Sequence, residues 1–143
     1  MEESLKNKEL QEKTAAADQY SPLTLAFMGD AVFEIFVREM IVTQSNRPVN
    51  KLHRASSVLV CAEAQARMIK ALKPFLTDKE LEIYKRGRNA KSHTSAKNAS
   101  IKDYRRATGF EALLGYLFLD GQTDRAQELM KKAVDSEKNS VKE

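Results

Sequence analysis

The sequence predicts an all-α protein. Only five Gly and three Pro occur among its 143 residues, which leaves few positions for hairpin turns, and runs of β-branched residues are scarce. Apolar residues instead recur every three or four positions, most clearly along residues 52–69. The composition, 42% hydrophobic and 31% charged, and the length both fit one globular domain with a real core.

The first two expected helices are delimited by proline. Ser21 is a suitable N-cap and proline at position 22 fits a first helical turn, so we expect a helix over residues 22–42. Pro48 then interrupts the chain. A second helix is expected over 50–72, before Pro74.

The third helix begins with a capping box. In the sequence TDKE, the Thr77 hydroxyl and the Glu80 carboxylate satisfy each other's backbone N–H groups, and we expect a short helix that ends near residue 86. Residues 87–100, GRNAKSHTSAKNAS, have no apolar periodicity. A long connection of this kind inside a compact domain is often functional.

Two more helices complete the expected bundle. Ser100 is expected to cap a helix that runs to about residue 120, with Gly121 as its C-terminal stop. A last helix is expected over 123–134. The polar stretches 1–20 and 135–143 flank the expected domain, which covers 21–134.

The N-terminal segment and the cysteine content favour a cytoplasmic protein. The first 20 residues lack the apolar region of a signal peptide, and no apolar run approaches the roughly 20 residues of a membrane span. The single cysteine, Cys61, excludes an internal disulfide and a cysteine-rich metal site, and it suits a reducing compartment. We therefore expect no membrane partner.

The positive charge is concentrated in residues 85–106. Eight basic side chains there face one acid, Asp103, so the segment carries +7; the whole chain is only +4, and the remainder is therefore −3. A basic block in an otherwise acidic protein is typical of a surface that binds a polyanion. The alternative is an ordinary solvated surface.

Two predicted helices are apolar almost all round, yet each holds a carboxylate in its middle. In LAFMGDAVFEIFVRE, Asp30 follows Gly29; in TGFEALLGYLFLDG, Glu111 lies between Gly109 and Gly115. All-round apolarity indicates a central helix or one that also meets a partner. We expect Gly29 to let another backbone approach closely beside Asp30.

A buried carboxylate needs compensation. One interpretation is an ion pair of Asp30 or Glu111 with Arg38 or Arg105. The other is a shared cation, because carboxylate oxygens from facing helices are the ligands that Mg²⁺ prefers, with waters and substrate phosphate completing its shell. With the basic block, the second interpretation indicates a metal-dependent nuclease.

These motifs also resemble a known family. LAFMGDAVFE resembles the first signature of ribonuclease III domains, GFEALLGYLFLDG resembles their last acidic motif, and LHRASSVLVCAEAQARMI is similar to the helix between them. The resemblance covers about residues 20–134. We expect no double-stranded-RNA-binding domain after this region, so that the chain resembles a stand-alone catalytic domain of the family.

The resemblance implies the ribonuclease III endonuclease fold, a helical bundle that forms a homodimer. It also implies Mg²⁺-dependent cleavage of double-stranded RNA, in maturation of the precursor of 23S ribosomal RNA, with no DNA substrate. Asp30 and Glu111 match the family's invariant acids, as catalytic residues and metal ligands. Phe27 matches a residue of the dimer interface.

Three family acids are missing, because Leu23, Ala26 and Thr108 stand at their positions. We therefore expect one Mg²⁺ per site, held by Asp30 and Glu111 with waters and phosphate oxygens. Glu34, one turn after Asp30, has two interpretations, a nearby supporting carboxylate or an ion pair with Arg38, and the ion pair is favoured.

The segment after residue 85 is the candidate RNA-binding surface. Cationic side chains there neutralise phosphates, and polar ones bond phosphate or 2′-hydroxyl oxygens; A-form RNA is recognised largely through its backbone. The candidates are Arg86, Arg88, Asn89, Lys91, Ser92, His93, Thr94 and Lys97. His93 is favoured as a phosphate contact over a general base.

Three functions are therefore compared. The first is an endoribonuclease specific for duplex RNA. The second is a non-catalytic, ribosome-associated RNA-binding factor, which the missing acids would allow. The third is a helical interaction domain with an incidental basic segment. Retention of both Asp30 and Glu111 favours the enzyme, because a purely binding module has no use for buried acids.

Overall fold

The structure, a computed structural model, describes residues 16–91 and 100–142. Within these residues there is no strand, and the prediction of an all-α fold is confirmed. The elements, in chain order, are η2 (Ala17–Gln19), α2 (Pro22–Gln44), α3 (Val49–Val60), α4 (Ala62–Leu72), η3 (Lys73–Phe75), α5 (Asp78–Asn89), α6 (Ile101–Leu119) and α7 (Thr123–Lys142).

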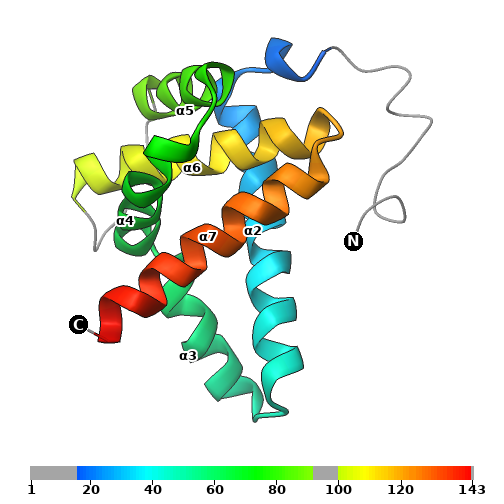
Figure 1. Cartoon of the computed structure of the whole chain (residues 1–143), viewed down its shortest axis with the longest axis vertical. Helices are drawn as coiled ribbons and strands as arrows, with labels where there is room; N and C mark the ends of the chain where they lie inside the picture. Colours follow the sequence, from blue (N-terminus) through cyan, green and yellow to red (C-terminus); the bar gives the residue numbers. More distant parts are fainter. Residues whose placement is uncertain (1–15, 92–99, 143) are drawn as a thin grey trace.

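Helix α6 forms the centre of the fold. In Figure 1 it runs across the molecule, and α2, α4, α5 and α7 all pack against it. Phe110 of α6 meets Phe33 of α2 edge to face, with ring centroids 5.2 Å apart and an interplanar angle of 82°, an arrangement that aromatic pairs prefer. This central place explains why α6 is apolar on almost every side.

The helix ends expected from capping signals are confirmed. The side chains of Ser21, Thr77 and Ser100 each accept a hydrogen bond from the backbone N–H three residues later. Glu80 completes the capping box by accepting from the Thr77 N–H at 2.9 Å. Gly121 has a φ of 79°, the left-handed conformation that lets the chain leave α6 and turn into α7.

The single helix expected over residues 50–72 is wrong, because the chain breaks there into α3 and α4. Cys61 separates them with an extended ψ of 158°. No Gly or Pro marks this break in the sequence. The break is a tertiary effect: α3 packs against α2, whereas α4 packs against α6 and α7.

Two other helices are longer than expected. Gly87 does not stop α5; it lies buried against α6, where an added Cβ would come within 2.7 Å of the Ala112 Cβ. Helix α7 continues beyond Val134 because Glu137, 7% exposed, is bonded by Arg67 of α4 at 2.8 Å. The apolar spacing ends near Val134, so the sequence pattern did not reveal this polar contact.

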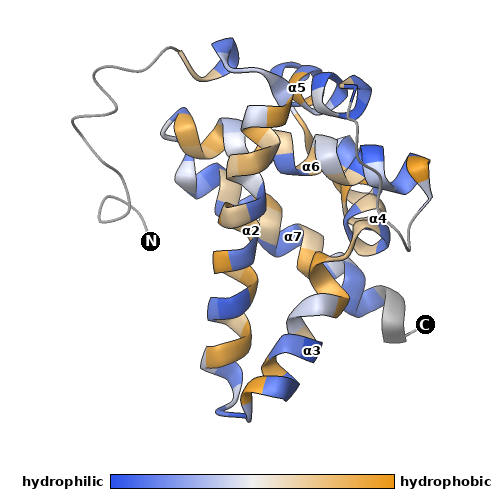
Figure 2. Cartoon of the chain, turned by 180° about the vertical axis from the view of Figure 1, so that it is seen from behind, coloured by the Kyte–Doolittle hydropathy of each residue, from blue (hydrophilic) through white to orange (hydrophobic). Residues whose placement is uncertain are grey.

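Helix α2 is covered on one side only. Leu25 and Phe33 are buried in the core, but Phe27 is 79% and Ile35 45% exposed, and apolar segments are visible along α2 in Figure 2. Asp30 is exposed as well, so the expectation that it is buried is wrong for the single chain. None of the helices in residues 16–91 and 100–142 combines the length and apolarity that crossing a membrane requires.

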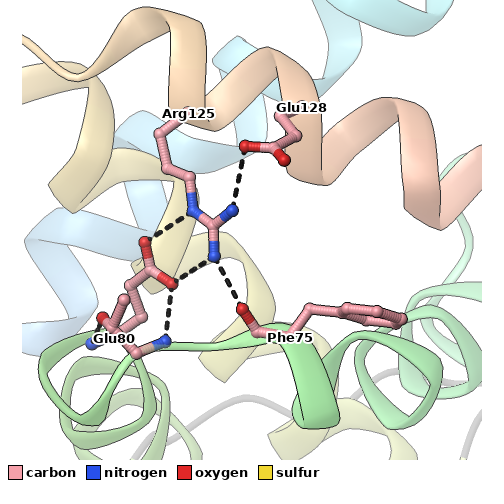
Figure 3. Close-up of polar contacts among 5 residues, drawn as sticks. Phe75, Glu80, Arg125 and Glu128 are labelled. Carbon is pink, nitrogen blue, oxygen red and sulfur yellow. Dashed lines mark hydrogen bonds and ion pairs between the residues drawn. The ribbon is translucent and has the colours of Figure 1, made fainter.

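A buried ion pair joins α5 to the start of α7 (Figure 3). Glu80, 4% exposed, accepts hydrogen bonds of 2.9 Å from both Nε and Nη2 of Arg125. Arg125 also donates to the Phe75 carbonyl at 2.7 Å and to Glu128 at 2.9 Å. Burial raises the pKa of Glu80, but the bonds from Arg125 and the Thr77 N–H outweigh burial and hold the pKa below its ordinary value.

We expect Arg125→Met to lower the free energy of unfolding by about 2–4 kcal/mol at pH 7, because Glu80 would stay buried without its partner. A folded-state pKa below the ordinary value of 4.5 means that the pair stabilises the fold above that pH, and that this contribution disappears as the pH falls through the lowered pKa. The difference from wild type should therefore shrink between pH 5 and pH 3 in urea titrations. Exposed Lys131→Met is the control, and a pH-independent difference would contradict this account.

Candidate active site

The candidate site lies where α2 crosses α6 at backbone contact. A Cβ added to Gly29 would overlap the backbone carbonyl oxygen of Glu111, and one added to Gly115 would overlap that of Leu25. The two glycines thus face each other's helices, and no side chain separates the backbones. The expected close approach beside Asp30 is confirmed, and its partner is the peptide unit of Glu111 itself.

This crossing brings the two predicted acids together. The Asp30 side chain comes within hydrogen-bonding reach of the Glu111 carboxyl. Asp30 is exposed and Glu111 is half-buried. Burial first, and then the neighbouring Asp30 charge, raise the pKa of Glu111 to about 8. Two carboxylates that repel each other are costly unless a proton or a cation lies between them.

No cationic side chain relieves this repulsion in the part of the chain that the structure describes. Neither Asp30 nor Glu111 forms an ion pair there, so the expected alternative of a bond to Arg38 or Arg105 is not found. Arg38 instead donates to Glu34 at 3.0 Å, which confirms the favoured interpretation of Glu34. The Glu34 charge still contributes to the raised pKa of Glu111.

The pair fits a divalent cation. Mg²⁺ commonly binds through one or two carboxylates and keeps its remaining positions for waters and substrate phosphate. Across residues 16–91 and 100–142, no group of three or more His, Cys, Asp or Glu side chains is placed to hold a metal. A cation here would therefore have two protein carboxylates, which is the sparse ligand set that the sequence predicts.

Two of the three positions that lack a family acid are buried in the packed interior. Ala26 and Thr108 are buried, and the Thr108 hydroxyl donates to the Tyr104 carbonyl at 3.0 Å. Leu23 is 41% exposed on the uncovered face of α2. None of these three side chains is a carboxylate, so the acids of the candidate site are Asp30 and Glu111.

A hollow of about 520 Å³ lined with cationic side chains, the basic groove, lies where the end of α5 meets the start of α6. Arg106 precedes Glu111 by five residues, about 7.5 Å along the axis of α6, so part of the groove lies on the same helix as Glu111. The lining residues are Lys73, Arg88, Asn89, Ile101, Lys102, Arg105 and Arg106.

The groove extends the sequence prediction. Arg88 and Asn89 were expected there, whereas Lys73 lies outside the basic block and could be found only from the fold. Lys73 and Arg88 both lie over the Tyr84 ring, at 5.3 and 5.6 Å from its centroid, as in cation–π contacts. Burial, followed by the charges of Arg88 and Arg106, lowers the pKa of Lys73, as expected where cations gather without an acid.

The other candidate RNA contacts differ in their surroundings. Lys91 is exposed. Arg86 donates to the carbonyls of Asp18 and Tyr20, at 3.1 and 3.3 Å, so its guanidinium anchors the chain before α2. The remaining candidates, Ser92, His93, Thr94 and Lys97, lie outside the described residues.

Residues 23–122 match the model of the ribonuclease III domain family, so the chain belongs to that family. This span contains the glycine crossing and both acids. The family consists of endoribonucleases that act on double-stranded RNA and generally depend on a divalent metal ion. The protein is accordingly an endoribonuclease of the ribonuclease III type.

Individual relatives are similar to this chain over most of its length. The chain is 50% identical to Mini-ribonuclease 3 of Clostridium tetani, over 79% of this chain and 76% of that protein. It is 45% identical to Mini-ribonuclease 3 of a Thermoanaerobacter species, over 91% of both chains. A crystal structure of a Fusobacterium nucleatum protein superposes with a TM-score of 0.77 at 25% identity, over 87% of this chain and 99% of that one.

Proposed function

We propose that this protein cleaves double-stranded RNA with one Mg²⁺ per site, held by Asp30 and Glu111. The observation that supports this most directly is the contact between two carboxylates that have no cationic partner among the described residues. Such a contact costs stability. A factor that only bound RNA would gain nothing from it.

Each carboxylate has a defined part in this proposal. When bound, Mg²⁺ supplies Lewis-acid activation of a phosphodiester and of a water. Asp30, on the exposed side, and Glu111, on the half-buried side, hold the cation from two different helices. The backbone contact at Gly29 and Gly115 sets the distance between those helices, and fixed positions are what a catalytic pair requires.

The basic groove would bind the backbone of the duplex beside the cut. Its cations come from η3, α5 and α6 and have no acid among the lining residues, so several phosphates can be neutralised together. Lys91, Ser92, His93, Thr94 and Lys97 are proposed as further RNA contacts from the sequence alone. Arg86 serves first to anchor the chain before α2.

We expect the double variant Arg88→Ala and Arg106→Ala to weaken duplex RNA binding and to flatten its salt dependence. The slope of log K against log salt should fall by about one for each lost phosphate contact. Filter binding with Ca²⁺ in place of Mg²⁺ measures this without cleavage. Lys131→Ala, on the exposed side of α7, is the matched control. An unchanged slope would mean that the basic groove does not contact the RNA phosphates.

We also propose that the protein is a homodimer joined through the uncovered apolar face of α2. Leu23, Phe27 and Ile35 are 41%, 79% and 45% exposed, and apolar side chains in a row on one helix face favour a partner surface. A two-fold axis near this face would place Phe27 of each copy in the same interface. Asp30 lies on the same exposed side of α2, so the partner would also come near it.

We expect Phe27→Glu to raise the dimer dissociation constant at least about 100-fold, because a charge would replace a large apolar side chain at the centre of the interface. Sedimentation velocity over a range of concentrations measures this. The control is Val49→Glu, an exposed apolar residue on α3. A Phe27→Glu protein that dimerises as tightly as wild type would contradict the proposed interface.

We propose the precursor of 23S ribosomal RNA as the substrate, on the basis of the resemblance to stand-alone ribonuclease III domains. The test compares this precursor, with its paired ends intact, with a duplex of equal length and shuffled sequence. We expect defined cuts in the precursor, with Mg²⁺ and not with Ca²⁺. If both RNAs are cut equally and at scattered positions, the protein is still a nuclease, but the 23S precursor is not its specific substrate.

A further inference from the structure

Gln65 has a buried side chain beside the candidate site. It lies in the first half of α4 and is 2% exposed. Its Nε2 donates to the Val60 carbonyl at 2.9 Å and to the Glu111 carboxylate Oε2 at 3.5 Å. Within the described residues, no other side chain donates a hydrogen bond to Glu111. Gln65 therefore connects Glu111 of α6 to α4, a third helix beside the candidate site.

The chemistry of its neighbours determines how the amide is oriented. The Val60 carbonyl can only accept, so the NH₂ group, not the amide oxygen, must face it, and the same NH₂ group lies 3.5 Å from the Glu111 carboxyl. Its two hydrogens can serve the two acceptors together. The shorter bond to Val60 holds the amide in place, and the longer one leaves Glu111 some freedom to adjust.

The break between α3 and α4 at Cys61 leaves the Val60 carbonyl free to accept the bond from Gln65. Val60 is the last residue of α3, and its carbonyl would bond a later backbone N–H if α3 and α4 were one helix. Cys61 instead adopts an extended conformation, and the Gln65 side chain takes the free carbonyl. The interruption that separates the two helices thus fixes an amide donor next to Glu111.

We propose that Gln65 is a positioning residue that holds the Glu111 carboxylate toward Asp30 for metal binding. This inference rests on the proposed metal site. A second observation supports it: Gln65 Oε1 is buried and has no hydrogen-bond donor among the described residues. An unpaired acceptor is costly, and water carried in by a hydrated cation is a donor that would satisfy it.

The test is Mn²⁺ binding to the RNA-free, full-length protein, followed by calorimetry or by the electron paramagnetic resonance of free Mn²⁺. We expect Gln65→Leu, which keeps the size and removes the amide, to weaken Mn²⁺ binding by about tenfold or more, as losses of groups that orient metal ligands do. In cleavage assays the Mg²⁺ requirement should rise by a similar factor. The KM for duplex RNA should stay unchanged.

A matched control separates positioning from folding. Arg67→Met lies on the same helix and breaks the contact to Glu137 without touching Glu111; it should bind Mn²⁺ as wild type does, although it is less stable. If Gln65→Leu does not fold, Gln65→Met replaces it. A folded Gln65 variant with Mn²⁺ affinity within twofold of wild type would overturn the role of Gln65 and leave the proposed metal site intact. Absence of Mn²⁺ binding by wild-type protein would overturn the metal site and the role of Gln65 with it.

Discussion

Asp30→Asn is expected to lower kcat for duplex RNA cleavage at least about 1000-fold, a loss of about 4 kcal/mol of transition-state stabilisation. Asn keeps the size of Asp and removes the charge that would hold the cation. Glu111→Gln is expected to have an effect of the same order, because both carboxylates would hold the same ion in the proposed site. RNA affinity measured in Ca²⁺ should stay within about threefold of wild type, since the basic groove is untouched.

The same substitutions should not destabilise the metal-free protein. Burial and the Asp30 charge raise the pKa of Glu111 to about 8, so the fold holds Glu111 in a site that opposes its ionisation, and replacing either acid by its amide relieves that cost. Thermal unfolding without metal should therefore give a Tm equal to or above that of wild type. Added Mg²⁺ should raise the Tm of wild type only, because a ligand stabilises only the protein that binds it.

Glu39→Gln is the matched control for these variants. Glu39 is an exposed acid of α2 that lines a different hollow, between α2 and α7. The Glu39→Gln protein should cleave RNA as wild type does, and Mg²⁺ should raise its Tm by the same amount. Cleavage by Asp30→Asn at a rate close to that of wild type would contradict the assignment of the site.

Gly115→Ala is expected to destabilise the protein by more than about 4 kcal/mol, or to prevent folding. The new methyl group would overlap the Leu25 carbonyl, and a backbone group cannot move aside as a flexible side chain can. In a helix without this contact, Gly→Ala stabilises by up to about 1 kcal/mol. The sign of the change therefore decides whether the close crossing exists.

Urea unfolding measures the effect if Gly115→Ala is soluble. If it is not, Gly115→Ser and the recovery of soluble protein in cells serve as a second measurement, with the same direction expected. The control is Ala31→Gly on the exposed side of α2, which should cost only about 1 kcal/mol. A Gly115→Ala protein as stable as wild type would contradict the backbone contact between α2 and α6.

The two acids illustrate what the sequence can predict. Asp30 and Glu111 are visible as single carboxylates in apolar helices, and glycine beside them predicts a close approach. Their contact is a result of the crossing between residues 81 positions apart in sequence. The exposure of Asp30 differs from the expected burial, because a pattern that is apolar all round does not tell which side of the helix the same chain covers.

Gln65 and Lys73 illustrate what the sequence does not show. Gln65 gains its place from the break at Cys61, where no Gly or Pro signals a change and where different packing partners separate α3 from α4. Lys73 lies outside the basic block, in η3, and only the fold places it beside the basic residues of α5 and α6 in the groove. Neither residue belongs to a local pattern, so neither was predicted.

The amino-acid sequence by itself determined the helical class and most helix starts and marked the two acids of the candidate site, because these depend on local spacing, capping and the cost of a charge in an apolar helix. Tertiary structure alone decided the break at Cys61, the length of α7, which residues line the basic groove and the exposure of Asp30. Those features depend on which distant surfaces meet. Only the assembled core determines that, and here two glycines allow its central helices to touch.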